Sequence, residues 1–268
     1  MSYSNPAAYE RFMGRWSARL APSFLRFAEV RDGQHVLDVG CGTGNLSRAL
    51  VSLGPTITVA GLDRATEYLT FAQEAAAHPR ARFQLGAAES IPFPDAKFDA
   101  ALALLVLQDF TNARQAVSEM TRVTQPGGVV AACLWDFQDG LPMLSLLWQA
   151  AEAVAPDAVL RNRSQNLRPP HATSSDLVSL WRRCGLCDIK TATLELPMEF
   201  SSFEEYWQPF LGKSTPTSGF AAALNQQTDC ALARDLRQKI PGVEADGSFV
   251  LPARAFAIKG IAPSGSAD

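Results

Sequence analysis

The stretch VLDVGCGTG, Val36–Gly44, decides the fold expected for this chain. An apolar run ends in glycines at positions 40, 42 and 44, and a helical pattern follows directly. Glycines let the backbone turn sharply and let it approach a ligand closely. In α/β proteins, ligands bind at the carboxyl edge of the sheet, where such a helix begins. The sequence therefore predicts a ligand crevice at the tip of the first strand.

Two carboxylates flank this glycine stretch. Asp63 lies 19 residues past Gly44, at the end of the next apolar run, where an acidic side chain accepts the hydroxyls of a ribose. Dinucleotide enzymes need a glycine at the sixth position of G-x-G-x-x-G to seat a pyrophosphate, but Asn45 holds that position. Asp38, two positions before the first glycine, repels a pyrophosphate and suits an ammonium group. This pattern favours S-adenosylmethionine, which has an ammonium and a sulfonium but no phosphate.

Short apolar runs alternate with helical segments around this motif. Alternation of this kind produces right-handed βαβ units and a parallel sheet. The first thirty residues have helical spacing interrupted at Pro22, and residues 155–170 are expected to be irregular. The predicted fold is α/β, a doubly wound, Rossmann-like, mostly parallel seven-stranded sheet with helical cap insertions and an N-terminal helical cover. The expected strands are 35–39, 57–62, 82–85, 98–104, 127–134, 188–196 and 249–259.

Residues 36–135 contain several motifs in a recognisable order. Asp38–Gly44 resembles the first motif of class I S-adenosylmethionine-dependent methyltransferases, and Asp63 resembles their ribose-binding acid. Four motifs in the right order on the right elements are a strong signal, although each alone is weak. The chain is most similar to the ubiquinone/menaquinone-biosynthesis-like branch. The other matching stretches are Gly86–Asp99 at the adenine, Leu104–Phe110 below the methyl donor, Arg122–Gly128 before the fifth strand, and Tyr9–Ser17, which resembles the helix that covers the cofactor.

The resemblance implies a set of cofactor-binding residues. Many of these enzymes carry an Asp where this chain has Ala87, and that Asp accepts a hydrogen bond from the adenine amino group. Here Glu89 replaces it or the bond is absent, while the backbone N–H of Ala88 still meets the adenine ring. The residues expected to bind S-adenosylmethionine are Tyr9, Arg15, Asp38, Gly40, Cys41, Gly42, Gly44, Asp63, Arg64, Ala88, Glu89, Leu104 and Gln108.

The implied reaction is methyl transfer to an O, N or C nucleophile of a small molecule, with S-adenosylhomocysteine as product. The donor is already activated, so positioning and exclusion of water are expected to dominate catalysis. Two residues are candidates for a catalytic role. Asp136 follows the fifth strand and either faces the acceptor or caps a turn. His171 is either a general base near neutral pH or an exposed loop residue.

We expect one methyltransferase domain over residues 1–268. It comprises an N-terminal helical cover at 1–30, a cofactor-binding core at 31–136, and substrate-side insertions at 137–185 and 197–245. An aromatic cluster of Tyr206, Trp207 and Phe210 is expected to pack in a core, with the wall of an apolar acceptor pocket as the alternative. A single C-x-x-C at Cys184–Cys187 is expected to be structural, and no metal site is predicted.

The composition limits which binding partners and which cellular location are expected. The net charge of -3 gives no basic face for nucleic acid. Five cysteines, an odd number, and the lack of a signal peptide or a long apolar run indicate a cytoplasmic protein without a membrane span. The expected partner is a small-molecule methyl acceptor, and the expected assembly is a monomer or a homodimer. Three rivals remain: an NAD-dependent oxidoreductase, a nucleic-acid methyltransferase, and a non-catalytic protein that binds the cofactor.

Overall fold

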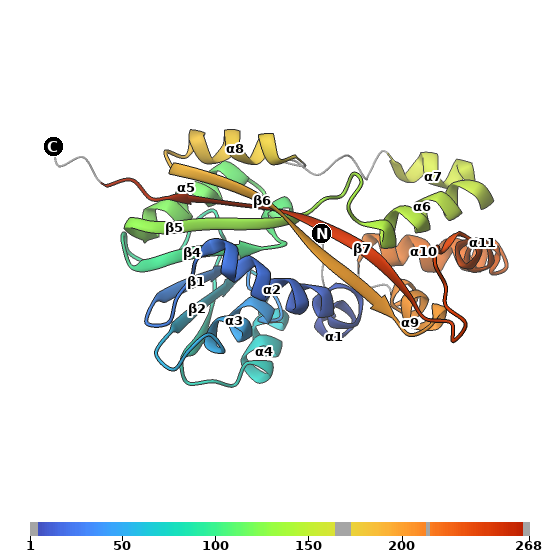
Figure 1. The fold of residues 1–268 in the computed structure, drawn as a ribbon, viewed down its shortest axis with the longest axis horizontal. Coiled ribbons are helices and arrows are strands. Elements are labelled where there is room, and N and C mark those ends of the chain that lie inside the picture. The colour runs from blue at the N-terminus through green and yellow to red at the C-terminus, as the bar shows by residue number, and fades with distance from the viewer. Residues whose placement is uncertain (1–4, 164–172, 213–214, 265–268) are drawn as a thin grey trace. The chain divides into compact units, whose positions relative to one another are not determined.

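The structure is a computed structural model that describes residues 5–163, 173–212 and 215–264 (Figure 1). Contacts between residues divide it into two units. The unit that we call the helical unit lies within Met1–Met13, Trp135–Pro169 and Glu195–Arg254. The unit that we call the sheet unit lies within Gly14–Leu134, Pro170–Leu194 and Ala255–Asp268. Each unit is described by itself below.

One seven-stranded sheet has the order β3-β2-β1-β4-β5-β7-β6. β1 pairs in parallel with β2 and β4, β2 with β3, and β4 with β5. The mostly parallel α/β sheet predicted from the sequence is therefore confirmed. The strands are β1 (His35–Val39), β2 (Thr58–Asp63), β3 (Ala81–Leu85), β4 (Phe98–Leu104), β5 (Thr124–Trp135), β6 (Cys187–Phe200) and β7 (Phe249–Ile261).

β7 runs antiparallel to β5. Gly127, early in β5, donates its N–H to the carbonyl of Ala262 just past β7, at 3.0 Å. Asp136, just past β5, donates its N–H to the carbonyl of Arg254 in the first half of β7, also at 3.0 Å. The start of one strand thus meets the end of the other. β5 and β6 are also longer than expected, because strand pairing continues through Thr124 and as far as Phe200.

Helices precede β1 and connect most of the strands. They are α1 (Pro6–Tyr9), the π-helical η1 (Glu10–Gly14), α2 (Arg15–Ala28), α3 (Asn45–Val51), α4 (Thr66–Ala75), the 3-10 helix η2 (Leu107–Asp109), α5 (Ala113–Val123), α6 (Pro142–Val154), α7 (Pro156–Arg163), α8 (Ser174–Arg183), α9 (Phe203–Trp207), the 3-10 helix η3 (Gln208–Leu211), α10 (Pro216–Gln227) and α11 (Ala231–Lys239).

Two expectations about helices were wrong. Pro22 does not interrupt the N-terminal helix but lies inside α2. Leu20, Phe24 and Leu25 of α2 are all buried, at roughly 1.5–3 kcal/mol each, which together exceeds the roughly 3 kcal/mol cost of an internal proline. Residues 156–163, expected to be irregular, form α7, because Pro156 suits the first turn of a helix and Val159 is buried.

Helices cover both faces of the sheet unit. Figure 1 shows α5 and α8 on one face and α2, α3 and α4 on the other. Met120 of α5 and Trp181 of α8 belong to one buried cluster with Leu37 and Val130 of the strands. The indole N–H of Trp181 donates to the carbonyl of Val130 at 3.1 Å. The doubly wound arrangement follows, because apolar strands need cover on both faces.

The helical unit has an aromatic core. Tyr206 and Phe210 are fully buried, and Trp207 is nearly so. The ring of Tyr206 packs against Phe200 and Phe249, and its hydroxyl donates to the carbonyl of Met143 at 2.8 Å. Burial raises the pKa of Tyr206. These side chains therefore pack as a core.

Among the helices that the structure describes, none combines the length and the apolar character needed to cross a bilayer.

Candidate functional site

The loop after β1 is built on glycines with left-handed backbone angles. The φ angles of Gly40, Gly42 and Gly44 are 68°, 52° and 80°. The N–H groups of Gly40 and Cys41 both donate to the carbonyl of Leu62 in β2, at 2.7 and 2.9 Å. A Cβ on Gly40 would lie 2.6 Å from Cγ2 of Val106. Glycine is therefore required here both for the backbone angle and for space.

Substituting Gly40 by Ala should lower the free energy of unfolding by about 3 kcal/mol. Roughly 1–2 kcal/mol comes from the left-handed backbone and the rest from overpacking against Val106. Urea denaturation measures the change. Gly185→Ala is the matched control, because Gly185 has φ 79° and no atom within 4 Å of a built Cβ, so it should lose only the roughly 1–2 kcal/mol of the left-handed backbone. Equal losses in the two variants would contradict the close packing at Gly40.

Asp63 at the end of β2 holds this loop. Its Oδ2 accepts the N–H of Gly42 at 2.9 Å, and its Oδ1 accepts the N–H of Ala65 at 2.9 Å. Each carboxylate oxygen has a second lone pair. The side chain is therefore fixed in orientation and still able to accept two more hydrogen bonds.

Asp38 lies under the glycines, at only 1% exposure. Its pKa is raised to about 7, mainly by burial and also by the charge of Asp63, while a hydrogen bond from Ser47 opposes the shift. The hydroxyl of Ser47 donates to Oδ2 of Asp38 at 2.6 Å. Burial likewise raises the pKa of Cys41. Two carboxylates thus meet at one loop with an acidic character, which suits a cation.

Sequence reasoning missed Ser47. Its signal was available, because a hydroxyl in the first turn of α3 (Asn45–Val51) follows the glycines directly. Such a residue faces back toward the strand that precedes the loop.

The loop between β3 and β4 contains Ala88 and Glu89. Ala88 is buried and belongs to the core cluster of the sheet unit. Oε1 of Glu89 accepts the N–H of Asn112 at 3.2 Å, and its backbone carbonyl accepts the side-chain amide of Gln115 at 2.8 Å. Glu89 therefore caps the start of α5 in this structure. This gives its carboxylate a structural partner besides the adenine contact expected from the sequence.

Leu104 ends β4, and Gln108 follows one turn later. Leu105 has a φ of 59°, and its carbonyl accepts the amide of Gln108 at 2.8 Å. The same amide nitrogen donates to Asp109 at 3.1 Å. The other end of the side chain, Oε1 of Gln108, is buried and has no hydrogen-bond partner among the described residues. A buried orphan acceptor costs about 1–3 kcal/mol, so this atom fits a ligand that brings a donor.

The remaining predicted residues lie on other elements of the chain. Arg15 lies at the start of α2 with its guanidinium 4.3 Å from the ring of Trp16, and Arg64 is exposed beside Asp63. Tyr9 ends α1 in the helical unit. His171 lies outside the described residues.

Asp136, also in the helical unit, organises a turn. Its Oδ1 accepts the N–H groups of Gln138 and Asp139 at 3.1 and 3.2 Å. Its Oδ2 pairs with Arg254 at 2.7 Å. The sequence left open whether Asp136 faces the acceptor or caps a turn, and these contacts favour the turn.

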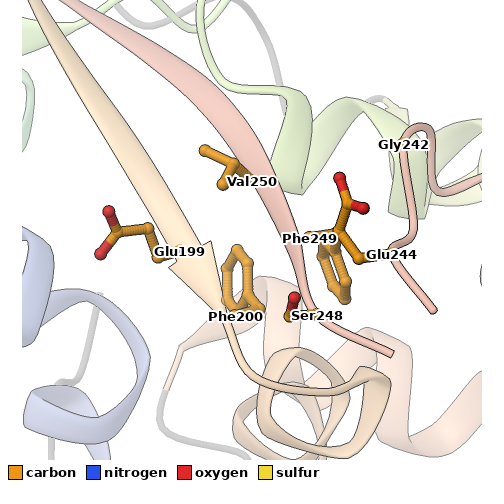
Figure 2. Close-up of a pocket in the computed structure, with 7 residues that line it drawn as sticks. All are labelled: Glu199, Phe200, Gly242, Glu244, Ser248, Phe249 and Val250. Carbon is orange, nitrogen blue, oxygen red and sulfur yellow. The ribbon is translucent and has the colours of Figure 1, made fainter. Parts of the chain in front are cut away.

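A cavity of about 280 Å³ lies in the helical unit (Figure 2). It is lined by Glu199, Phe200, Gly242, Glu244, Ser248, Phe249 and Val250, from β6, β7 and the loop before β7. None of the residues predicted from the sequence lines it. Among the described residues, no group of three or more His, Cys, Asp or Glu is arranged to hold a metal ion.

The sheet order, the glycine loop after β1 and the acid at the end of β2 define the class I S-adenosylmethionine-dependent methyltransferase fold. Solved structures agree. A methyltransferase from Bacillus halodurans has a TM-score of 0.59 at 18% identity and covers 91% of this chain and 99% of its own. A Haemonchus contortus phosphoethanolamine N-methyltransferase has a TM-score of 0.59 at 17% identity and covers 98% and 58%.

Residues 37–132 match the family model described as Methyltransferase domain. A malonyl-[acyl-carrier protein] O-methyltransferase of Erwinia billingiae is 36% identical over 58% of this chain and 57% of its own length. A fatty-acid O-methyltransferase of Mycolicibacterium smegmatis is 29% identical over 63% and 60%. A demethylmenaquinone methyltransferase of Deinococcus radiodurans is 35% identical over 35% and 40%. The chain spans about half the length of the curated relatives it matches.

Proposed function

We propose that this protein transfers a methyl group from S-adenosylmethionine to a small-molecule acceptor. The observation that carries the proposal is the pair of carboxylates, Asp38 and Asp63, at a glycine loop with left-handed backbone. A loop of this charge repels a pyrophosphate and attracts a cationic nucleoside. Asn45 in place of the third dinucleotide glycine also speaks against an NAD-dependent oxidoreductase.

The residues present fit this donor. Two backbone N–H groups fix the orientation of the Asp63 carboxylate. Each of its oxygens keeps one lone pair that can accept a ribose hydroxyl. Asp38 supplies the counter-charge for the ammonium. Gln108 supplies a buried acceptor, Oε1, that has no hydrogen-bond partner among the described residues. The predicted contacts of Tyr9, Arg15 and Arg64 stay predictions.

When bound, the donor supplies an activated methyl group on a sulfonium. The chain's own residues then have three tasks: to orient the donor through Asp63 and Asp38, to hold the acceptor in line with the methyl group, and to exclude water. Positioning of this kind contributes several kcal/mol to a rate, about 7 or more in favourable cases. A base is needed only for an acceptor that must lose a proton, and Asp136 and His171 stay predictions for that role.

We infer that the acceptor presents an oxygen nucleophile. The relatives named for malonyl-[acyl-carrier protein] and fatty-acid O-methylation support an oxygen on an acyl molecule. We assign donor binding to residues 31–136, with the segments 137–185 and 197–245 on the acceptor side. Cytoplasmic location and a monomer or homodimer stay predictions from the sequence.

Calorimetry with S-adenosylhomocysteine and with NADH tests the proposal. The product should bind in the micromolar range or tighter, and NADH should not bind. Transfer of labelled methyl from the donor to a panel of fatty acids, malonyl thioesters and phenols then identifies the acceptor. Binding of NADH alone would replace the proposal by an oxidoreductase. Binding of the product, with no transfer to any of these or to nucleic acid, would leave a non-catalytic binder.

A further inference from the structure

One polar face of α5 contacts the loop that follows β3. Gln115, Glu119 and Arg122 lie at positions i, i+4 and i+7 and therefore share a face of the helix. The opposite stripe of α5, including Val117 and Met120, is buried in the core of the sheet unit. The helix is thus fixed on one side and presents charged and amide groups on another.

Arg122 contacts the backbone of the loop at several points. Its Nη2 donates to the carbonyl of Ile91 and its Nη1 to the carbonyl of Phe93, both at 3.0 Å. Nη1 also pairs with Oδ1 of Asp95 at 2.6 Å. These bonds use the planar fork of the guanidinium, which a lysine cannot reproduce.

Glu119 and Gln115 extend these contacts toward Ala88. Oε2 of Glu119 accepts the N–H of Ile91 at 2.9 Å, and its Oε1 accepts from Nε of Arg122 at 2.7 Å. The side chain of Gln115 donates to the carbonyl of Glu89 at 2.8 Å. Three consecutive turns of α5 therefore hold loop residues 89, 91 and 93.

The loop has a reason to need this support. Ala87 has no carboxylate for the adenine, so recognition of the base falls to the backbone at Ala88, with the neighbouring Glu89 as the alternative acceptor. The position of the backbone N–H of Ala88 depends on how firmly the surrounding loop is held. Ala87 forms an isolated bridge with Ser90, whose N–H donates to the carbonyl of Ala87 at 3.2 Å, and the contacts from α5 begin at the next residues on either side of Ser90.

We propose that Gln115, Glu119 and Arg122 position the adenine-binding turn at Ala87–Ala88 and thereby set the affinity for the donor. The inference rests on the proposed function, since it assumes that the turn meets an adenine. The three are positioning residues, because they act through the loop backbone and do not touch the donor.

The experiment compares S-adenosylhomocysteine with its 1-deaza and 3-deaza analogues, in which a ring nitrogen is replaced by C–H. The wild-type protein should lose about tenfold in affinity for one analogue, because a hydrogen bond to the base is lost. In Arg122→Ala, binding of S-adenosylhomocysteine should weaken about tenfold and the preference over that analogue should fall below about twofold. Arg122→Lys should recover only part of the preference.

Gln115→Ala is the milder variant, because Gln115 is exposed and makes one bond to the loop. Its preference for S-adenosylhomocysteine over that analogue should fall about threefold relative to the wild type. Arg114→Ala is the matched control, an exposed arginine of the same helix that makes none of the side-chain bonds to the loop described above, and it should bind like the wild type. If Arg122→Ala does not fold, Gln115→Ala decides. Wild-type preference in the folded variants would overturn this inference and leave the proposed function standing. No binding of S-adenosylhomocysteine by the wild type would instead overturn the proposed function.

Discussion

Substituting Asp63 by Ala should reduce affinity for S-adenosylhomocysteine roughly 1,000-fold, about 4 kcal/mol, because two hydrogen bonds to a charged carboxylate are lost together. The variant also releases the N–H groups of Gly42 and Ala65, which should loosen the glycine loop. Isothermal calorimetry gives the Kd. Asp63→Asn keeps one acceptor oxygen, so its Kd should lie between those of the wild type and Asp63→Ala.

Asp32→Ala controls for the structural part of this effect. Oδ1 of Asp32 accepts the N–H groups of Thr56 and Ile57, each at 2.8 Å, so the control loses a comparable pair of carboxylate bonds. Asp32 precedes β1 whereas Asp63 ends β2, so the two lie at opposite ends of neighbouring parallel strands. Asp32→Ala should lose stability while it keeps the wild-type Kd. An unchanged Kd in Asp63→Ala would remove Asp63 from the site.

The parts of the fold that the sequence predicted are those whose causes are local. β1 and β4 are near-continuous apolar runs, each with one aspartate, and their bounds match the expectation. The glycine loop was predictable because positive φ angles demand glycine at 40, 42 and 44. Asp38 and Asp63 followed from their places at the ends of strands.

The parts that the sequence did not predict depend on partners distant in the chain. The bonds from Arg122 to Ile91 and Phe93 join residues about thirty positions apart, and no spacing rule connects them. The same holds for Glu89, whose carboxylate accepts the N–H of Asn112 just before α5. Pro22 was misjudged because the buried face of α2 outweighs a local preference.

Asp38→Asn should make the ligand-free protein more stable at pH 8, by up to about 4 kcal/mol. Burial raises the pKa of Asp38 from 3.8 to about 7, so the native state keeps a proton that the unfolded state has lost. The stability due to this proton is fully present below pH 3.8 and is lost as the pH rises through 7. Asn carries no such proton, so the advantage of the variant should grow by about 1.4 kcal/mol per pH unit in this window. Urea denaturation from pH 4 to 8 measures it.

Asp38→Asn should also weaken donor binding. The variant would then be more stable but bind the donor less tightly, so the two effects can be told apart. The ammonium of the donor pairs with the ionised form of Asp38, so wild-type affinity relative to Asp38→Asn should rise with pH up to about 7 and then level off. Ser47→Ala removes the hydrogen bond that favours the ionised form, so both curves should level off at a higher pH in that variant. A pH-independent stability difference between wild type and Asp38→Asn would mean that Asp38 is ionised throughout. In that case the carboxylate of Asp38 would already be charged before the donor binds. The pH dependence of donor binding should then also be absent.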